Sequence, residues 1–431
     1  MHRSMIPELG FADDIILMSE TTSKLQAQID ICETWSKLNG MKFNVDKCKV
    51  LPLNMGLKGL QFNLDGKSIE IVTKTKYLGV LLSRSRLTSL YGKHIKEVLE
   101  KAEVRVNAIK HKGFKSDGLR QETTIRMYKA LVRPILEYAA QVISYKHYYF
   151  TDRKCEPLEE PTGMIKRLEQ FQNRVLKKLV PCPKKTNPAM VRLLTGTMPM
   201  TGRIDMLKLR YFWRLHHTGE DKVAKQVYLQ LRKIFLQSNV GYVHEIFNIC
   251  CKYDRIDLWH GHCPEKINPL SRIKRIVETF HIQKDLEVAR KTKCVYTALI
   301  DFKAKRYTMD KRFCQVGRFQ TAKHRSTFLF SLLDSSSHDR QCKHCGIIVK
   351  DIKRHGMEEC SRLVNQRKGF CMMMEFYGAT KEIDLANKTE VFQLALSKKC
   401  FLNEFCKWLV FIWKTDENDD REQTCMQAPS L

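Results

Sequence analysis

Two adjacent carboxylates near the start of the chain constrain its fold more than any other feature. Asp13 and Asp14 lie between Phe11 and the apolar run at residues 15–18. This pattern predicts two short apolar strands joined by a tight turn that carries both acids. Acids between apolar strands are costly unless they are paired or bind a cation, and their oxygens are ligands that Mg²⁺ prefers. The alternative, an Asx turn that simply ends a strand, stays open at this point.

The rest of the first 83 residues alternates between strand and helix patterns. Apolar residues recur at helical spacing over residues 20–39, and Gly40 is expected to end this helix. Alternating residues then predict a strand over 41–45. A hairpin follows, in which Asp65-Gly66 suits a type I′ turn, and residues 77–82 predict a further strand.

Beyond residue 83 the pattern changes to helices. Apolar stripes at three- and four-residue steps predict four of them, over 95–109, 125–136, 165–179 and 204–215. Pro134 is expected to kink or break the second helix. The signal weakens over 225–330, although residues 227–236 still indicate a helix.

The chain is strongly basic. Lys and Arg number 75 and Asp and Glu number 47, a surplus of 28 positive charges in 431 residues. Such a surplus attracts polyanions and most often indicates nucleic-acid binding, with a merely solvated basic surface as the alternative. Hydrophobic residues make up 43% of the chain, which argues against general disorder. We therefore expect RNA and DNA as partners.

The sequence shows neither a secretory signal nor a membrane span. Residues 1–18 lack the basic start, long apolar run and cleavage site of a signal peptide. No apolar stretch approaches the roughly 20 residues that cross a bilayer. We therefore expect an intracellular protein, nuclear or cytoplasmic and not secreted, in a reducing compartment. There the 16 cysteines would be free or metal-bound rather than bridged.

A basic stretch with interleaved aromatic residues begins at Phe302. Cations clamp phosphates and aromatic rings stack on unpaired bases. The candidate nucleic-acid contacts in this stretch are Lys303, Lys305 and Arg306. The alternative is that Phe302 and Tyr307 belong to the core, as aromatic residues at such intervals usually do.

One histidine and three cysteines have metal-site spacing, Cys-x2-Cys-x9-His-x4-Cys: Cys342, Cys345, His355 and Cys360. Four such ligands can close a tetrahedral Zn²⁺ site, which would be structural because it leaves no open position. Gly346 suits the tight turn that brings the first two thiolates together. Chance spacing among many cysteines is the alternative. The nearby basic residues, among them Lys350, Lys353 and Arg354, fit contact with RNA or DNA.

Five motifs follow one another in a set order. The first three are Phe-Ala-Asp-Asp at 11–14, Gly-Met-Lys-Phe-Asn-Val-Asp-Lys-Cys-Lys-Val at 40–50 and Tyr-Leu-Gly-Val at 77–80. The last two are Tyr-Lys-Ala-Leu-Val-Arg-Pro-Ile-Leu-Glu-Tyr at 128–138 and Leu-Glu-Gln-Phe-Gln-Asn-Arg-Val-Leu at 168–176. This order resembles the second half of the palm, and the following helices, of reverse transcriptases from non-LTR (LINE-type) retrotransposons. The cysteine and histidine set resembles the CCHC element that follows the polymerase in the same retrotransposons.

The resemblance implies a role for each matching residue in nucleotidyl transfer by two Mg²⁺ ions. Asp13 would be the shared metal ligand and Asp14 a weaker or orienting one. Lys47 would protonate or stabilise the pyrophosphate leaving group, unless it is an ordinary exposed lysine. The primer end would be placed by the primer-grip residues, for which a plain buried strand is the alternative: Tyr77, Leu78 and Gly79.

The expected architecture is α+β, a truncated reverse-transcriptase palm of antiparallel strands plus a helix, followed by a mostly helical thumb. We expect five parts: the palm at 1–83, a helical thumb or connection at 84–224, a basic, mostly helical region at 225–330, a zinc-knuckle-like CCHC element at 331–370, and a C-terminal helix with a disordered tail at 371–431. In the family, the fingers and the first catalytic Asp precede the Asp-Asp turn. We expect both to be missing, so that the chain alone does not polymerise DNA. The alternative function is a non-catalytic, zinc-containing RNA- or DNA-binding protein derived from a retrotransposon.

Overall fold

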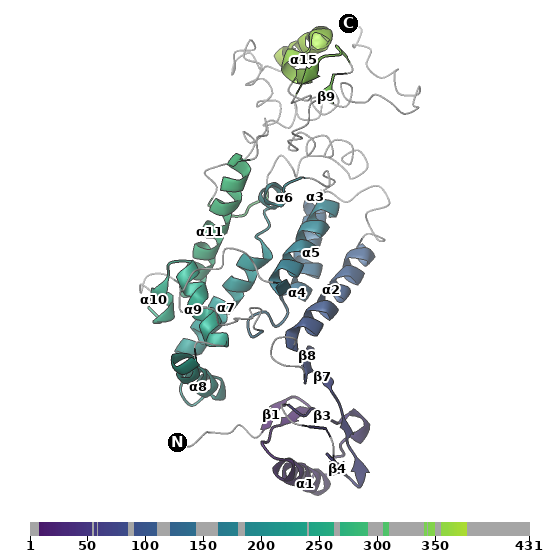
Figure 1. The fold of residues 1–431 in the computed structure, drawn as a ribbon, viewed down its shortest axis with the longest axis vertical. Coiled ribbons are helices and arrows are strands. Elements are labelled where there is room, and N and C mark those ends of the chain that lie inside the picture. Colours follow the sequence, from purple (N-terminus) through teal and green to yellow (C-terminus); the bar gives the residue numbers. More distant parts are fainter. Residues whose placement is uncertain are drawn as a thin grey trace. The chain divides into compact units, whose positions relative to one another are not determined.

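The computed structural model describes residues 8–53, 56–57, 59–84, 90–109, 121–143, 163–179, 186–238, 241–262, 268–291, 305–309, 340–342, 344–349 and 355–376 (Figure 1). They form a mixture of helix and strand in which helix predominates. The chain divides into two compact units, Met1–Val98 and Leu99–Leu431.

The first unit is built from short strands around one helix. Its elements are β1 (Glu8–Phe11), β2 (Asp14–Leu17), α1 (Thr22–Leu38), a 3₁₀ turn (Val45–Lys47), β3 (Lys49–Val50), β4 (Asn63–Leu64), β5 (Lys67–Ser68), β6 (Glu70–Ile71), β7 (Lys74–Tyr77), β8 (Val80–Ser83) and the start of α2 (Leu90–Ile109). Three pairs are antiparallel, β1 with β2, β4 with β5 and β7 with β8. The fourth pair, β3 with β6, is parallel.

Helix α1 forms where the apolar spacing predicts it. The Thr21 hydroxyl accepts a hydrogen bond from the Lys24 N–H at 3.3 Å and caps the first turn. At the other end Gly40 has a φ of +64°, a conformation that glycine adopts without strain. The helix buries Ile29 in a small core with three side chains from the strand region: Phe62, Leu64 and Ile69.

The hairpins confirm one turn prediction and correct two strand predictions. Asp65 and Gly66 have φ values of +54° and +71°, as a type I′ turn requires. The single strand expected over 77–82 is wrong, because Leu78 and Gly79 also have positive φ and form the turn between β7 and β8. The strand expected over 41–45 is also wrong. There the local hydrogen bond from Cys48 N–H to Val45 O, 3.0 Å long, closes a 3₁₀ turn instead.

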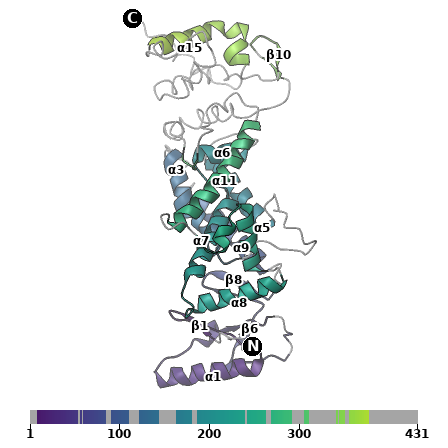
Figure 2. The same cartoon turned by 90° about the vertical axis from the view of Figure 1, so that its left-hand side faces the viewer.

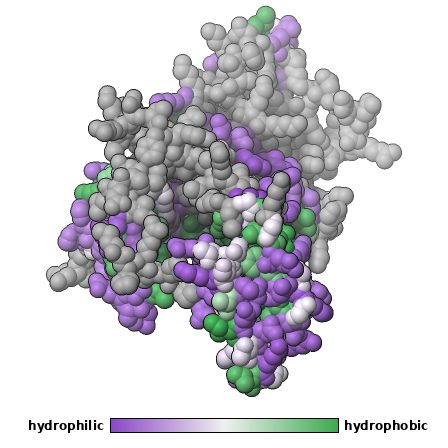
Figure 3. All heavy atoms as spheres, turned by 60° about the horizontal axis from the view of Figure 1, so that its bottom comes forward, coloured by the Kyte–Doolittle hydropathy of each residue, from purple (hydrophilic) through white to green (hydrophobic). Residues whose placement is uncertain are grey.

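Several apolar side chains of this first unit are exposed to solvent. They lie on β1 and β2 and on the outward face of α1, and include Leu9, Phe11, Ile15, Ile31, Trp35 and Leu38. Figure 3, turned by 60° from the view of Figure 1, shows apolar patches among hydrophilic residues.

Helices account for most of the residues that the structure describes in the second unit. After the end of α2 come α3 (Gln121–Met127), a π-helical turn (Tyr128–Val132), α4 (Arg133–Glu137), α5 (Gly163–Leu179), α6 (Pro188–Thr195), α7 (Met200–His217), α8 (Val223–Ser238), α9 (Tyr242–Lys252), α10 (Ile256–Trp259) and α11 (Pro269–Lys291). Farther along lie β9 (Arg340–Gln341), β10 (Ile348–Val349), a second π-helical turn (His355–Glu359), a 3₁₀ turn (Ser361–Leu363) and α15 (Val364–Phe376). All four predicted apolar stripes lie on helices, and residues 227–236 fall within α8.

The predicted break at Pro134 is confirmed. A π-helical turn over Tyr128–Val132 precedes it, and Pro134 lies in the first turn of α4, where its missing N–H is not needed. The wide turn buries Tyr128, whose hydroxyl donates to Gln172 Oε1 at 2.9 Å. Lys129 Nζ donates to the carbonyl oxygens of Thr195 and Gly196 at 3.1 and 2.7 Å, at the negative end of the α6 dipole.

The main core joins α7 to the helices that come after it. It runs from Met198 to Val277 and contains the stacked rings of Phe212 and Trp259, whose centroids are 5.5 Å apart. Helix α11 packs against both α6 and α7 (Figure 2). This core therefore contains side chains from both sides of residue 224, such as Leu215 and Tyr228. The sequence predicts a boundary between two parts at that residue.

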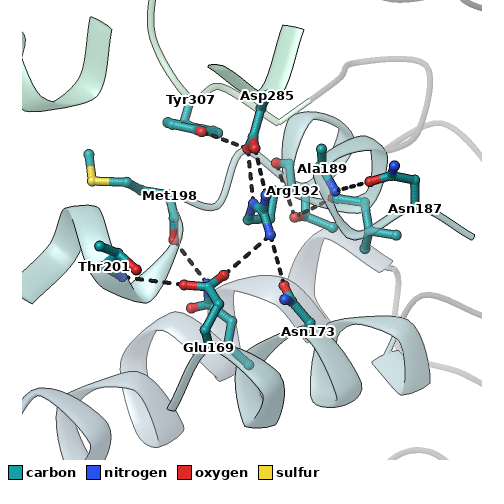
Figure 4. Close-up of polar contacts among 12 residues, drawn as sticks. Glu169, Asn173, Asn187, Ala189, Arg192, Met198, Thr201, Asp285 and Tyr307 are labelled. Atoms are coloured by element: carbon teal, nitrogen blue, oxygen red, sulfur yellow. Dashed lines mark hydrogen bonds and ion pairs between the residues drawn. The ribbon is translucent and has the colours of Figure 1, made fainter. Parts of the chain in front are cut away.

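A buried ion network ties three helices of this unit together (Figure 4). Arg192 of α6 donates to both carboxylate oxygens of Asp285 in α11, at 2.9 and 2.5 Å. The same guanidinium donates to Glu169 and Asn173 of α5 at 3.2 and 3.1 Å. Burial raises the pKa of Glu169, against the opposing effect of Arg192. The network therefore supplies the cation that these acids need.

Residues 305–309 return to the same three-helix junction. Tyr307 donates from its hydroxyl to Asp285 Oδ2 at 2.7 Å and from its backbone N–H to Glu278 Oε1 at 2.9 Å. Gly196 has a φ of +57°, and a Cβ placed there would lie 2.4 Å from the backbone of Thr308 and Met309. This close approach requires glycine at the end of α6.

Candidate metal centres

Asp13 and Asp14 lie on the hairpin between β1 and β2. Phe11 pairs with Asp14 across the ladder, which leaves Ala12 and Asp13 as a two-residue turn. Ala12 has a φ of +52° and Asp13 does not have a positive φ, the pattern of a type II′ turn, which favours glycine at the Ala12 position. Both carboxylates are exposed, so they avoid the cost of burial that the apolar flanks suggest.

The two acids have no third ligand beside them in the described ranges. Within those ranges, only the cysteine and histidine cluster brings three or more ligand atoms within 4.8 Å of one another. A two-metal site for phosphoryl chemistry needs a cluster of carboxylates around the ions. The hairpin by itself offers adjacent oxygen ligands for a hard cation, without the enclosure that would bind it tightly.

Lys47 and the expected primer-grip residues lie on different elements from Asp13 and Asp14. Lys47 is exposed in the 3₁₀ turn, and no hydrogen bond or ion pair joins it to Asp13 or Asp14 in the part of the chain that the structure describes. Tyr77 is half-buried, whereas Leu78 and Gly79 are exposed at the tip of the β7–β8 hairpin. The alternative of a plain buried strand therefore does not hold for Leu78 and Gly79, whereas Tyr77 is the last residue of strand β7.

The basic aromatic stretch is described only in part. Lys305 and Arg306 are exposed, as contacts to a phosphate backbone would need to be. Tyr307 is committed to the helical unit by its bonds to Asp285 and Glu278, so for this ring the core alternative holds. The other basic candidates lie outside the described residues: Lys303, Lys350, Lys353 and Arg354.

The structure brings together the four residues with metal-site spacing. All four ligand atoms lie within 4.8 Å of one another. The Sγ atoms of Cys342 and Cys360 are 3.9 Å apart, and Cys345 Sγ is 3.1 Å from His355 Nε2. Three of the residues are buried and Cys345 is half-buried. Three sulfur atoms and one imidazole nitrogen in a closed cluster are a ligand set suited to Zn²⁺.

Two local turns create this cluster. The first two cysteines lie on the turn between β9 and β10, where Gly346 N–H donates to Cys342 O at 2.6 Å. Gly346 has a φ of +79°, so the expected role of glycine in this turn is confirmed. The other two ligands flank the π-helical turn, in which Cys360 N–H donates to His355 O at 2.6 Å.

The thiols of the cluster differ in acidity. Burial acts to raise the pKa of Cys342, but hydrogen bonds from the backbone N–H groups of Cys345 and His344 outweigh it, and the pKa lies below its ordinary value. For Cys360, burial together with the neighbouring cysteines raises the pKa. Since the thiolate is the form that binds metal, Cys342 is the better prepared of the two.

Two residues that contact the cluster, Glu359 and Arg367, could not be predicted from the sequence. Glu359 lies one helical turn after His355, with its Oε2 3.6 Å from His355 Nδ1, on the side of the ring opposite the atom that faces Cys345. Arg367 of α15 donates to the carbonyl oxygen of Gly356, in the π-helical turn, and to that of Cys360, which follows the turn. Both are ordinary charged residues in a basic segment, and only the helical spacing between His355 and Glu359 hints at a contact.

Comparison with known proteins shows that the N-terminal segment is similar to polymerases. Residues 3–82 match the family model described as reverse transcriptase (RNA-dependent DNA polymerase). The chain is also similar to the RNA-directed DNA polymerase from mobile element jockey of Drosophila funebris, at 27% identity over 139 residues. That alignment covers 31% of this chain and 15% of the jockey protein. No solved structure matches the chain significantly.

The two matches agree with each other. Both identify sequence related to reverse transcriptases, and the jockey protein belongs to a mobile element. They support a relationship to the reverse transcriptases of mobile elements, and the match to the reverse-transcriptase model lies at residues 3–82. Among the described helices, none is long and apolar enough to cross a membrane.

Proposed function

We propose that this chain is part of the RNA-directed DNA polymerase of a non-LTR retrotransposon, in which Asp13 and Asp14 bind Mg²⁺. The observation that carries the proposal is the tight β1–β2 hairpin, with Asp13 in its turn and Asp14 at the start of β2, inside the segment that matches reverse transcriptases. In this proposal Asp13 would be the shared Mg²⁺ ligand and Asp14 a weaker or orienting one. Lys47 would protonate or stabilise the leaving pyrophosphate, and Tyr77, Leu78 and Gly79 would place the primer end.

The chain by itself is proposed to be inactive as a polymerase. Asp13 and Asp14 are exposed and adjacent, and the described residues bring no further carboxylate to them. Two divalent ions held only by such a pair would be loosely positioned, and phosphoryl transfer depends on positioning and charge stabilisation.

Primer extension on an RNA template tests both statements. The purified chain, its Asp13→Asn variant and, as a control, its Asp30→Asn variant are assayed with Mg²⁺ and deoxynucleotides. Asp30 is an exposed acid on α1. We expect no synthesis above background from any of the three. Synthesis by the parent chain and the control that is lost in Asp13→Asn would refute the inactivity and would support the metal-binding role.

The cysteine and histidine cluster is proposed to hold one structural Zn²⁺. The fit rests on ligand atoms already gathered within 4.8 Å and on a donor set with no place for a substrate. Elemental analysis of protein purified without chelator is expected to find about one zinc per chain. Cys342→Ser should lose it, and Cys371→Ser, on α15 outside the cluster, should retain it. A zinc-free parent chain would overturn this assignment.

A second candidate function is nucleic-acid binding without catalysis. The surplus of 28 positive charges favours it, together with a closed metal cluster suited to a structural role. Binding to labelled RNA and DNA is expected to weaken steeply between low and physiological salt, because counterions are released from the phosphates. Binding that is insensitive to salt would contradict both candidate functions, whereas Asp13-dependent synthesis would select the polymerase.

A further inference from the structure

Arg367 contacts the turn that carries half of the metal ligands. It lies in the first part of α15 and extends its guanidinium back toward the π-helical turn. Nη2 donates to Cys360 O at 2.7 Å and Nη1 donates to Gly356 O at 3.2 Å. One rigid, planar fork therefore bonds to Gly356, the residue after His355, and to Cys360 itself.

Both acceptors are backbone carbonyl oxygens, and a buried carbonyl oxygen without a hydrogen bond destabilises the fold. Cys360 is fully buried, and Gly356 is buried as well. A π-helical turn is a single wide turn that rarely persists without a local reason. Here the backbone hydrogen bond from Cys360 N–H to His355 O closes the turn. The guanidinium of Arg367, which belongs to the following helix, adds two further hydrogen bonds to this segment. The spacing of the two ligands is thus set by a backbone bond and by Arg367 together.

The charge of Arg367 also suits this position. Three thiolates and one Zn²⁺ carry a net charge of about −1, because three negative charges outweigh two positive ones. Leu363 and Phe370, on the same short stretch, are buried and keep water from part of the element. A fixed cation counts for more in such a setting than in open water, and arginine stays charged at any working pH.

We propose that Arg367 is a positioning residue of the metal cluster, which holds His355 and Cys360 at binding distance and offsets the net charge of the thiolates. The inference rests on the proposed zinc site, because it assigns a residue outside the ligand set to the same cluster. Partners of this kind, which orient metal ligands without touching the metal, are worth about 10–100-fold in metal affinity.

The test measures metal binding by the full chain and three variants. Arg367→Met removes the fork and the charge, Arg367→Lys keeps the charge without the fork, and Lys368→Met changes an exposed neighbour on the same helix. Zn²⁺ affinity is measured by competition with a chromophoric chelator. Co²⁺ substitution reports tetrahedral geometry by its visible absorption, and circular dichroism checks that helix content is kept.

Arg367→Met is expected to bind Zn²⁺ about 10–100-fold more weakly than the parent, with an altered Co²⁺ spectrum and faster release of metal to the chelator. Arg367→Lys should fall between the two, and Lys368→Met should match the parent. Parent-like affinity and spectrum in both Arg367 variants would overturn the inference while leaving the zinc site in place. A parent chain that binds no Zn²⁺ would instead refute the zinc site itself. If Arg367→Met does not fold, Arg367→Lys decides the question alone.

Discussion

Removal of the Arg192 guanidinium should destabilise the helical unit far more than removal of an exposed arginine. Arg192→Met keeps the length of the side chain but leaves Glu169 and Asp285 buried without their cation. The side chain of Arg192 is 12% exposed, and those of Glu169 and Asp285 are 14% and 5% exposed. Removing one partner of a buried pair costs about 3–5 kcal/mol. We expect a loss in that range in the free energy of unfolding.

The chain provides a matched control for this change. Arg174 forms the same kind of two-pronged pair with Glu103, with bonds of 3.2 and 2.6 Å, but the two side chains are 47% and 31% exposed. Exposed pairs contribute about 0–1 kcal/mol. Arg174→Met should therefore cost about 1 kcal/mol or less. Urea unfolding followed by circular dichroism gives both values under the same conditions.

The pH dependence of the loss separates an unpaired charge from a packing defect. Burial already raises the pKa of Glu169 against the opposing effect of Arg192, so removing Arg192 should raise that pKa further above its value in the unfolded chain. The folded state then takes up a proton first, and the penalty is present at neutral pH and shrinks as pH falls through the raised pKa. Adding Asp285→Asn should recover part of the loss. Equal losses in Arg192→Met and Arg174→Met, or a loss independent of pH, would refute this reasoning.

Three further predictions concern single positions. Gly196→Ala should destabilise the helical unit by more than about 1 kcal/mol, because its φ is +57° and its Cβ would meet the backbone of residues 308–309; urea midpoints measure this. Leu78→Gly should stabilise the β7–β8 hairpin by about 0.5–1 kcal/mol by relieving a φ of +46°, seen as slower amide exchange. Burial lowers the pKa of His281 to about 3, so stability should fall as pH drops below about 6.5, by up to about 1.4 kcal/mol per pH unit. His281→Gln should flatten that slope and the exposed His217→Gln should not.

Local signals in the sequence predict the elements whose causes are local. The stripe on α5 is buried along its whole length, from Ile165 to Leu179, because one apolar face at helical spacing suffices to define that helix. The Asp65-Gly66 turn is predictable because few residues tolerate positive φ. The Cys/His cluster is predictable for a similar reason, since ligand type and spacing are both written in a short stretch.

Distant contacts leave no such trace in the sequence. Arg192 and Asp285 are 93 residues apart, and nothing in either helix alone pairs them. The turn at Leu78-Gly79 is not predictable from the residue types, because leucine seldom adopts a positive φ. The exposure of Asp13 and Asp14 depends on the pairing partners of β2, which the apolar pattern of one strand does not specify. The placement of Tyr307 depends on two acids contributed by α11.

The return of residues 305–309 to the three-helix junction has a consequence for how the coding sequence tolerates interruption. A stop codon between residues 291 and 305 would spare every described helix from α3 to α11. It would still remove the donors that Tyr307 gives to Glu278 and Asp285 and uncover Gly196. An early stop at that point would therefore weaken the helical unit itself, in addition to deleting the cysteine and histidine cluster beyond it.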